Sequence, residues 1–113
     1  MFDSVTINAL SSALDGLAAR QRAIADNIAN VNTPGYRSRV VTFESALARS
    51  VADGEGVSAP ASSRSTAPVN QNGNNVSLDS ETLNNIETVL RFQFASRAVG
   101  ADFEATRAAM RTA

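Results

Sequence analysis

Apolar residues recur at alternating steps of three and four over the first 32 positions of the chain. This spacing is that of one face of an amphipathic helix, or of the seam of a coiled coil. A single polar residue, Gln21, interrupts the series. The pattern predicts a long helix over residues 3–32, with a seam formed by Ile7, Leu10, Leu14, Leu17, Gln21, Ile24, Ile28 and Val31.

Specific residues mark the ends of this helix. Asp3 suits the N-cap, because its carboxylate can accept from the free amides of the first turn, and Phe2 and Ile7 are spaced for a hydrophobic staple across it. Pro34 disfavours helical backbone at the residue before it, and the Pro-Gly pair fits the centre of a type II turn. The helix is therefore predicted to stop near Asn32.

Gly16 lies in the middle of this predicted helix. Glycine costs about 1 kcal/mol relative to alanine in a helix interior. Either a neighbouring helix approaches closely at this position, or the glycine is merely tolerated.

A second long helix is predicted over residues 79–112, with Asp79 as its N-cap and with Leu78 and Leu83 at staple spacing. Two apolar stripes run along it, and together they are wider than one antiparallel partner helix would cover. The main seam is Leu83, Ile86, Leu90, Phe94, Ala98, Ala101, Ala105 and Ala108, and the second stripe is Val89, Phe92, Val99, Phe103 and Met110.

The segment between the helices has no sustained period. Residues 36–42 could be extended, and residues 43–51 could make two helical turns. From residue 53 onward Gly, Ser, Ala, Asn and Pro dominate, a composition typical of mobile linkers. The fold prediction is all-α: two long N- and C-terminal helices forming a coiled-coil-like hairpin with an irregular connecting loop. The expected parts of this one structural unit are residues 1–32, the N-terminal helix; 33–52, a turn and short connecting element; 53–78, a flexible linker; and 79–113, the C-terminal helix.

Composition excludes most catalytic chemistry. The 113 residues include no histidine and no cysteine, so the chain has no thiol nucleophile, no Ser-His-Asp triad, no zinc site of the usual nitrogen and sulfur kind and no disulfide. We therefore expect no enzyme, no cofactor and no metal. A net charge of -1 predicts no nucleic-acid partner, and no apolar run approaches the ~18 residues that direct membrane insertion requires.

The length of the chain and the width of the apolar surface on the second helix together predict assembly with other subunits. Two helices of about 30 residues would each be roughly 45 Å long. A hairpin of such helices buries one stripe on each, which leaves the second C-terminal stripe facing water. We expect other subunits to complete the core.

Three asparagines, Asn27, Asn30 and Asn32, gather at the end of the first helix, although asparagine is a mediocre helix former. They could simply cap a fraying terminus. Alternatively, their amides could bind the following turn or a neighbouring subunit. Arg20 and Arg22 are expected to serve solubility and ion pairing on the polar side of the helix.

The same region carries a family resemblance. The segments DGLAARQ (15–21) and IANVNTPGYR (28–37) resemble the N-terminal signature of bacterial flagellar axial proteins, the rod, hook and hook-associated proteins. Larger members of that family have β-rich domains between two terminal helices. A chain of 113 residues leaves no room for one, so the resemblance implies a small proximal-rod subunit. The segment 73–81 also resembles the start of the C-terminal helix in such subunits.

The resemblance implies a non-enzymatic structural subunit of the flagellar basal body. It would polymerise helically into the drive shaft in the periplasmic space, linking the membrane (MS) ring to the rest of the rod. The implied partners are further copies of itself, the rod proteins FlgC and FlgF, the adaptor FliE, the MS ring and the flagellar type III export gate. Export would proceed without a cleaved signal peptide. The alternative is a helical export chaperone or adaptor, which would have no reason to contain the Asn-Thr-Pro-Gly-Tyr turn.

Candidate site residues follow from the two helices and this resemblance. Phe43 and Leu47 match a short Phe-x-x-x-apolar element by which the export gate recognises early substrates of the family. Alternatively, Phe43 packs against the tube of helices. The expected subunit interface comprises Ile7, Leu10, Leu14, Leu17, Ile24, Asn27, Ile28, Asn30, Val31, Asn32, Pro34, Gly35, Tyr36, Leu83, Ile86, Leu90, Phe94, Ala98, Ala101 and Ala105.

Overall fold

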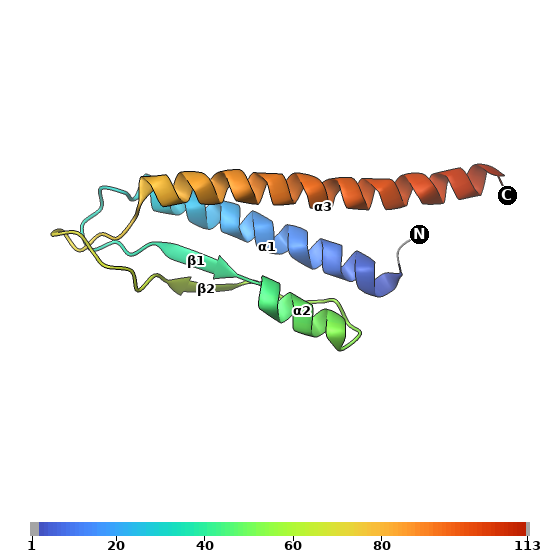
Figure 1. Cartoon of the computed structure of the whole chain (residues 1–113), viewed down its shortest axis with the longest axis horizontal. Coiled ribbons are helices and arrows are strands. Elements are labelled where there is room, and N and C mark those ends of the chain that lie inside the picture. The colour runs from blue at the N-terminus through green and yellow to red at the C-terminus, as the bar shows by residue number, and fades with distance from the viewer. Residues whose placement is uncertain (1–2, 113) are drawn as a thin grey trace.

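Two long antiparallel helices in contact form the body of the molecule, with a small sheet and a short helix between them in the chain (Figure 1). This confirms the predicted pair of terminal helices. The computed structural model describes residues 3–112, so the proposed staple of Phe2 lies outside the described residues. The elements are α1 (Ser4–Ala29), β1 (Arg39–Thr42), α2 (Glu44–Ala52), β2 (Ala61–Arg64) and α3 (Leu78–Thr112).

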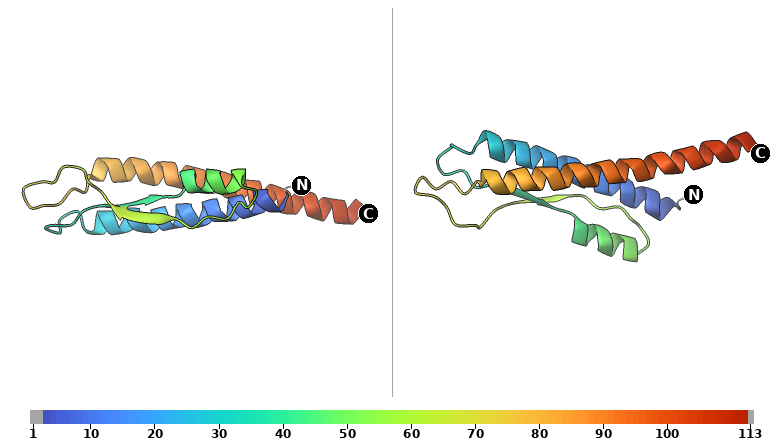
Figure 2. Two further views of the ribbon diagram at one scale, coloured as in Figure 1. Left: turned by 90° about the horizontal axis from the view of Figure 1, so that it is seen from below. Right: turned by 45° about the horizontal axis from the view of Figure 1, so that its top comes forward.

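The molecule is markedly elongated, at 66 × 27 × 14 Å. Its radius of gyration is 17.7 Å, whereas a compact domain of this length would have about 13 Å. Helix α3 continues past the N-terminal end of α1 (Figures 1 and 2), and the two helices separate toward that end in the view of Figure 1. The interior is correspondingly small. Its buried apolar side chains are Leu17, Ala23, Ile24, Val41, Phe43, Val76 and Ala95.

Helix α1 begins as predicted and ends slightly early. The Asp3 carboxylate accepts a 2.8 Å hydrogen bond from the Thr6 amide, which confirms the N-cap. The helix stops at Ala29 rather than near Asn32, with Asn30 as its C-cap. The Asn30 side chain donates to the carbonyl of Asp26 (2.8 Å), which the Asn30 amide also binds (3.1 Å).

The predicted tight turn follows the end of α1. The Tyr36 amide donates to the Thr33 carbonyl (3.2 Å). Gly35 adopts φ +75°, the left-handed conformation that a type II turn requires at this position.

Helix α3 starts one residue earlier than predicted. The Ser80 amide donates to the Ser77 hydroxyl (3.3 Å), so Ser77 occupies the capping position and Asp79 lies in the first turn. The predicted staple is also wrong, because Leu78 and Leu83 are both exposed. A cap at Ser77 moves the staple positions away from these two leucines.

The connection between the helices contains an antiparallel strand pair, in which Arg39 lies opposite Arg64 and Thr42 opposite Ala61. Strand β1 falls in the stretch that the sequence allowed to be extended, and α2 falls where two helical turns were allowed. Strand β2 was not predicted, because its Ala-Ser-Ser-Arg sequence has neither β-branched nor apolar alternating residues.

The loop after α2 docks on α1. The Ser12 hydroxyl donates to the Gly56 carbonyl (3.2 Å) and accepts from the Ser58 amide (3.2 Å). Gly56 adopts φ +76°, and a Cβ there would lie 2.5 Å from the Val5 carbonyl oxygen. This part of the predicted linker therefore lies directly on the helix backbone.

Another part of the chain does approach Gly16 closely, but it is the aromatic ring of Phe43 and not a neighbouring helix. A Cβ at Gly16 would lie 2.5 Å from two carbons of the Phe43 ring. The side chain that begins α2 therefore fits against bare helix backbone, where the sequence suggested a neighbouring helix.

Candidate subunit interface

The buried side chain of Asn27 joins α1 to β1. It accepts a hydrogen bond from the Arg39 amide (2.8 Å) and donates one to the Arg39 carbonyl (3.0 Å). A residue on a neighbouring strand exchanges the same two bonds in a β-ladder. One side chain of a helix therefore closes the outer edge of β1 at this position.

The same amide also reaches α3 and the turn. Its nitrogen donates to Glu81 Oε1 (3.1 Å), and its oxygen accepts from the Tyr36 hydroxyl (3.1 Å). Two donor hydrogens and two acceptor lone pairs are all used. Asn27 thus holds four parts of the chain in one place and is only 1 % exposed.

Glu81 forms the α3 side of this joint. It is 6 % exposed, and its second oxygen, Oε2, is buried without a hydrogen-bond partner. Burial raises the pKa of the Glu81 carboxyl, and the hydrogen bond from Asn27 offsets part of that effect.

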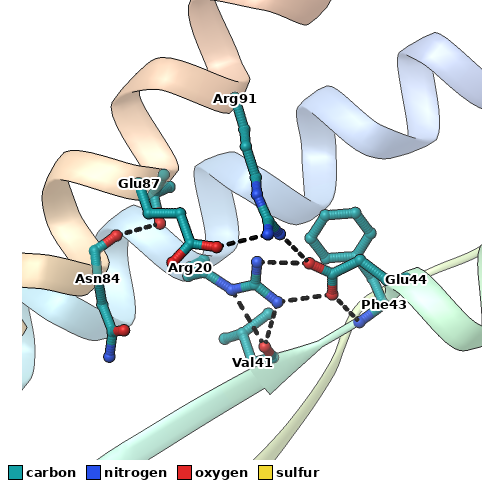
Figure 3. A network of polar contacts seen from close by, with 8 residues as sticks. Arg20, Val41, Phe43, Glu44, Asn84, Glu87 and Arg91 are labelled. Carbon is teal, nitrogen blue, oxygen red and sulfur yellow. Dashed lines mark hydrogen bonds and ion pairs between the residues drawn. The ribbon is translucent and has the colours of Figure 1, made fainter.

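An arginine network holds the next turn of the helices together (Figure 3). Arg20 of α1 binds both carboxylate oxygens of Glu44 at 2.7 Å and donates to the Val41 carbonyl at 2.8 Å. Arg91 of α3 joins the same carboxylate at 2.9 Å and pairs with Glu87 one turn earlier in α3. The Arg20 hydrogen bonds lower the pKa of Glu44 to about 2.

The Arg20 guanidinium also lies 4.9 Å from the centre of the Phe43 ring. This arginine therefore holds the ring that fills the space above Gly16. The sequence placed Arg20 on the solvated side of α1, and it does form an ion pair there. The structure adds that this ion pair ties α1 to α2 and α3. Arg22 is exposed.

A second asparagine, Asn74, docks the end of the connection on the turn after α1. Its side chain is 1 % exposed and donates to the carbonyls of Asn30 (2.9 Å) and Thr33 (2.8 Å). Gly73 lies against Gly35, where an added Cβ would be 3.2 Å from the Gly35 Cα.

Two members of the predicted asparagine cluster also bind this turn, because Asn27 Oδ1 accepts from the Tyr36 hydroxyl (3.1 Å) and Asn30 Oδ1 accepts from the Thr33 hydroxyl (3.0 Å). These contacts confirm the interpretation that amides of the cluster bind the following turn.

The contacts of Glu81 with Asn27 and of Arg91 with Glu44 set the rotation of α3 about its own axis; we call these contacts, together with those of Arg20 and Asn74, the polar joints. The residues that face α1 are Glu81, Thr88 and Ala95, all buried and spaced by seven. At 100° per residue the predicted main seam points the opposite way. The prediction that this seam packs against the first helix is therefore wrong. The polar contacts of Glu81 and Arg91 hold the other face of α3 toward α1 instead. The outward residues Leu83, Ile86, Leu90 and Phe94 are 53–78 % exposed.

The other predicted interface residues lie in mixed positions. Leu17 and Ile24 are buried inside the chain, and so is Asn27. Half-buried are Ile7, Leu10, Leu14, Asn30, Val31, Tyr36 and Ala98, while Ile28, Asn32, Pro34, Gly35, Ala101 and Ala105 are exposed. Of the export-gate candidates, Phe43 is buried and Leu47 half-buried.

Three residues of the joints were missed by sequence reasoning: Glu44, Asn74 and Glu81. The partners of Glu44 are 24 and 47 residues away in the chain, and Glu81 is 54 residues from Asn27. Local spacing carries no signal at such separations. Between residues 3 and 112, no three acidic side chains converge as metal ligands would, and no helix is apolar and long enough to span a bilayer.

Residues 7–37 match the family model described as "Flagella basal body rod protein". The flagellar basal body rod protein FlgB of Borrelia hermsii is 55 % identical over 38 residues, which are 34 % of this chain and 28 % of that protein. The chain is therefore similar to flagellar basal body rod proteins over this N-terminal segment. The matched segment contains Gly16, Arg20, Asn27 and Tyr36, so the family signature coincides with the α1 side of the joints.

Proposed function

We propose that the chain is a structural subunit of the proximal rod of the flagellar basal body, similar to FlgB. The observation that carries this proposal is the outward apolar face of α3, namely Leu83, Ile86, Leu90 and Phe94. Large apolar patches on a protein surface mark sites of interaction. The polar joints hold this face away from the chain's own core, where a neighbouring subunit can cover it.

The proposed assembly is helical. A contact between two different surfaces of identical subunits does not close on itself and so builds a filament. Further copies of the chain, the rod proteins FlgC and FlgF, the adaptor FliE and the MS ring are the proposed neighbours. The proposed site of assembly is the periplasmic space.

Export and folding are linked in this proposal. The candidate gate element begins with Phe43, which is 6 % exposed and lies against Gly16. The export gate would therefore bind this element while the chain is unfolded. Docking of Phe43 on α1 would then hide it after export.

The test is recovery of the chain in purified basal bodies from cells that carry Leu90→Arg. A charge at this position should abolish incorporation, while the amount exported stays near that of the natural chain. Val57→Arg is the matched control, because Val57 is exposed to a similar degree (62 % against 61 %) but lies in the loop after α2. Normal incorporation of Leu90→Arg would refute the proposed interface.

Replacement of a small residue by a large one tests the same face of α3 closer to its C-terminal end. Ala101→Leu adds bulk where close helix approach is expected, so it should obstruct rod assembly more than secretion. Motility and basal-body immunoblots would report both effects. Recovery of the chain only in the cytoplasm, bound to an export substrate, would favour a chaperone instead.

A further inference from the structure

Asn72 and Gly73 form a peptide bond whose sequence is prone to spontaneous deamidation. Asn72 is the only asparagine of the chain that is followed by glycine. In such a pair the backbone nitrogen of the glycine can attack the side-chain carbonyl carbon of the asparagine, because glycine has no Cβ to hinder the approach. Asn72 is exposed, so water reaches this position.

The fold holds both polar groups of this peptide bond. The Asn72 carbonyl accepts a hydrogen bond from the Gly35 amide (2.8 Å), and the Gly73 amide donates to the Asn70 carbonyl (2.9 Å). The Asn72 side-chain oxygen accepts from the Asn74 amide (3.1 Å), which forms an Asx turn. The attacking nitrogen and the side chain that it would attack are therefore both engaged elsewhere.

These contacts depend on docking of the connection between β2 and α3 on the turn after α1, at one end of the molecule (Figure 1). The Gly35 amide belongs to that turn. The buried side chain of Asn74 fixes the docked position, because it donates to the carbonyls of Asn30 and Thr33 at 2.9 and 2.8 Å. Undocking of the connection would therefore release the peptide bond between residues 72 and 73.

We propose that Asn72 is a deamidation site that is closed in the docked fold and open in the undocked chain. In the undocked chain the Gly73 nitrogen bonds to the Asn72 Cγ, and its proton leaves with the side-chain nitrogen as ammonia. The resulting cyclic succinimide takes up one water, which opens either carbonyl of the ring. The products are aspartate, with the original backbone, and isoaspartate, in which the backbone runs through the former side chain.

Isoaspartate at position 72 should prevent the connection from docking. It places one extra backbone carbon before Gly73, which should break the hydrogen bonds that the Gly35 and Gly73 amides make at 2.8 and 2.9 Å. Aspartate keeps the original backbone and an acceptor for the Asn74 amide. Isoaspartate is therefore a covalent record of the time that a chain spends undocked. Under the proposed rod function, chains that wait unfolded for export would be the ones modified.

Timed incubation of the full-length chain tests the closed and open states. One sample is folded in buffer and one is unfolded in urea, at the same pH and temperature, and peptide mass spectrometry measures deamidation at residue 72. The folded chain should react on the order of tenfold more slowly or less, because only its locally opened fraction is reactive. Equal rates in the two samples would overturn the proposal.

Asn74→Ala tests whether docking is the source of the protection. This variant loses the side-chain hydrogen bonds to Asn30 and Thr33 but keeps every reacting atom. In buffer it should deamidate at residue 72 severalfold faster than the natural chain, whereas in urea the two rates should coincide. Asn84→Ala is the matched control, since Asn84 is an exposed asparagine of α3, and it should leave both rates unchanged.

A rate in buffer that Asn74→Ala leaves unchanged would overturn the proposal. Circular dichroism shows whether the long helices of this variant remain folded. If they do not, the comparison of the natural chain in buffer and urea still decides the outcome.

The separated products test the consequence for docking. After refolding, the aspartate form should protect the Gly35 amide from hydrogen exchange as the natural chain does, and the isoaspartate form should lose that protection. Equal protection in both forms would overturn the link between modification and docking. The rod function would still stand after any of these negative results, because the chemistry requires only the docked and undocked forms of the isolated chain.

Discussion

The side chain of Asn27 exchanges two hydrogen bonds with the backbone of Arg39, at 2.8 and 3.0 Å, as a neighbouring strand residue would. A helix side chain thereby completes a sheet, and the same amide also binds Glu81 on the other long helix. Asn27 therefore links the position of the small sheet to the packing of the two long helices.

Replacement of Asn27 by alanine should lower the free energy of unfolding by roughly 3 kcal/mol, because buried backbone and hydroxyl groups lose their partners. Urea unfolding followed by circular dichroism measures the change. Asn32→Ala is the control, since Asn32 belongs to the same cluster but is exposed. Equal stabilities of the two variants would contradict the role assigned to Asn27.

Two glycines in long helices should respond to alanine with opposite signs. Gly16→Ala drives a Cβ to 2.5 Å from the Phe43 ring and should destabilise the chain by about 1–3 kcal/mol. Gly100→Ala meets nothing within 4 Å and should stabilise α3 by about 1 kcal/mol. Thermal unfolding of both variants is the measurement, and a gain of stability at Gly16 would show that the ring does not pack there.

Acid should weaken the arginine network through Glu44. Because the folded pKa is lowered from 4.5 to about 2, this carboxylate contributes stability that is present above pH 4.5 and is lost as the pH falls toward 2. Arg20→Lys removes the two-pronged contact, so its acid unfolding should begin at a higher pH. Arg22→Lys should leave the acid transition unchanged, and a shift as large as that of Arg20→Lys would contradict this assignment.

Glu81 should have the opposite pH dependence. Its folded pKa is raised above 4.5, so its contribution is fully present below that pH and is lost as the pH rises through the folded value. Glu81→Gln keeps an acceptor for Asn27 and cannot ionise. Its stability should match the natural chain near pH 4 and exceed it increasingly toward pH 7, as measured by melting temperature. A constant difference across this range would refute the assignment.

The helices and the turn after α1 were predictable because their signals are local. Asp3, Pro34 and Gly35 each act within a few residues of their position, and the alternating seam of α1 extends over 25 residues. The rotation of α3 was not predictable in this way. Its apolar pattern favours Leu83 and Leu90 as inner residues, and only the distant polar partners of Glu81 and Arg91 turn that face outward.

The small sheet also has one strand that its local sequence indicates and one that it does not. Strand β1 has the Val-Val pair typical of strands, whereas β2 is held by its pairing with β1. The linker composition reflects how few apolar side chains this segment buries, Val76 among them. It does not indicate that Gly56 and Asn74 dock on the first helix and its turn, because backbone contacts of this kind require few apolar side chains.

The closed edge of β1 has a consequence for how copies can adhere. The Arg39 amide and carbonyl and the Val41 carbonyl are occupied by side chains of the chain's own first helix. Strand addition at that edge, which would lock neighbours into a fixed ladder register, is therefore blocked. Contacts between copies on this side of the sheet would therefore be made by side chains, which impose no ladder register.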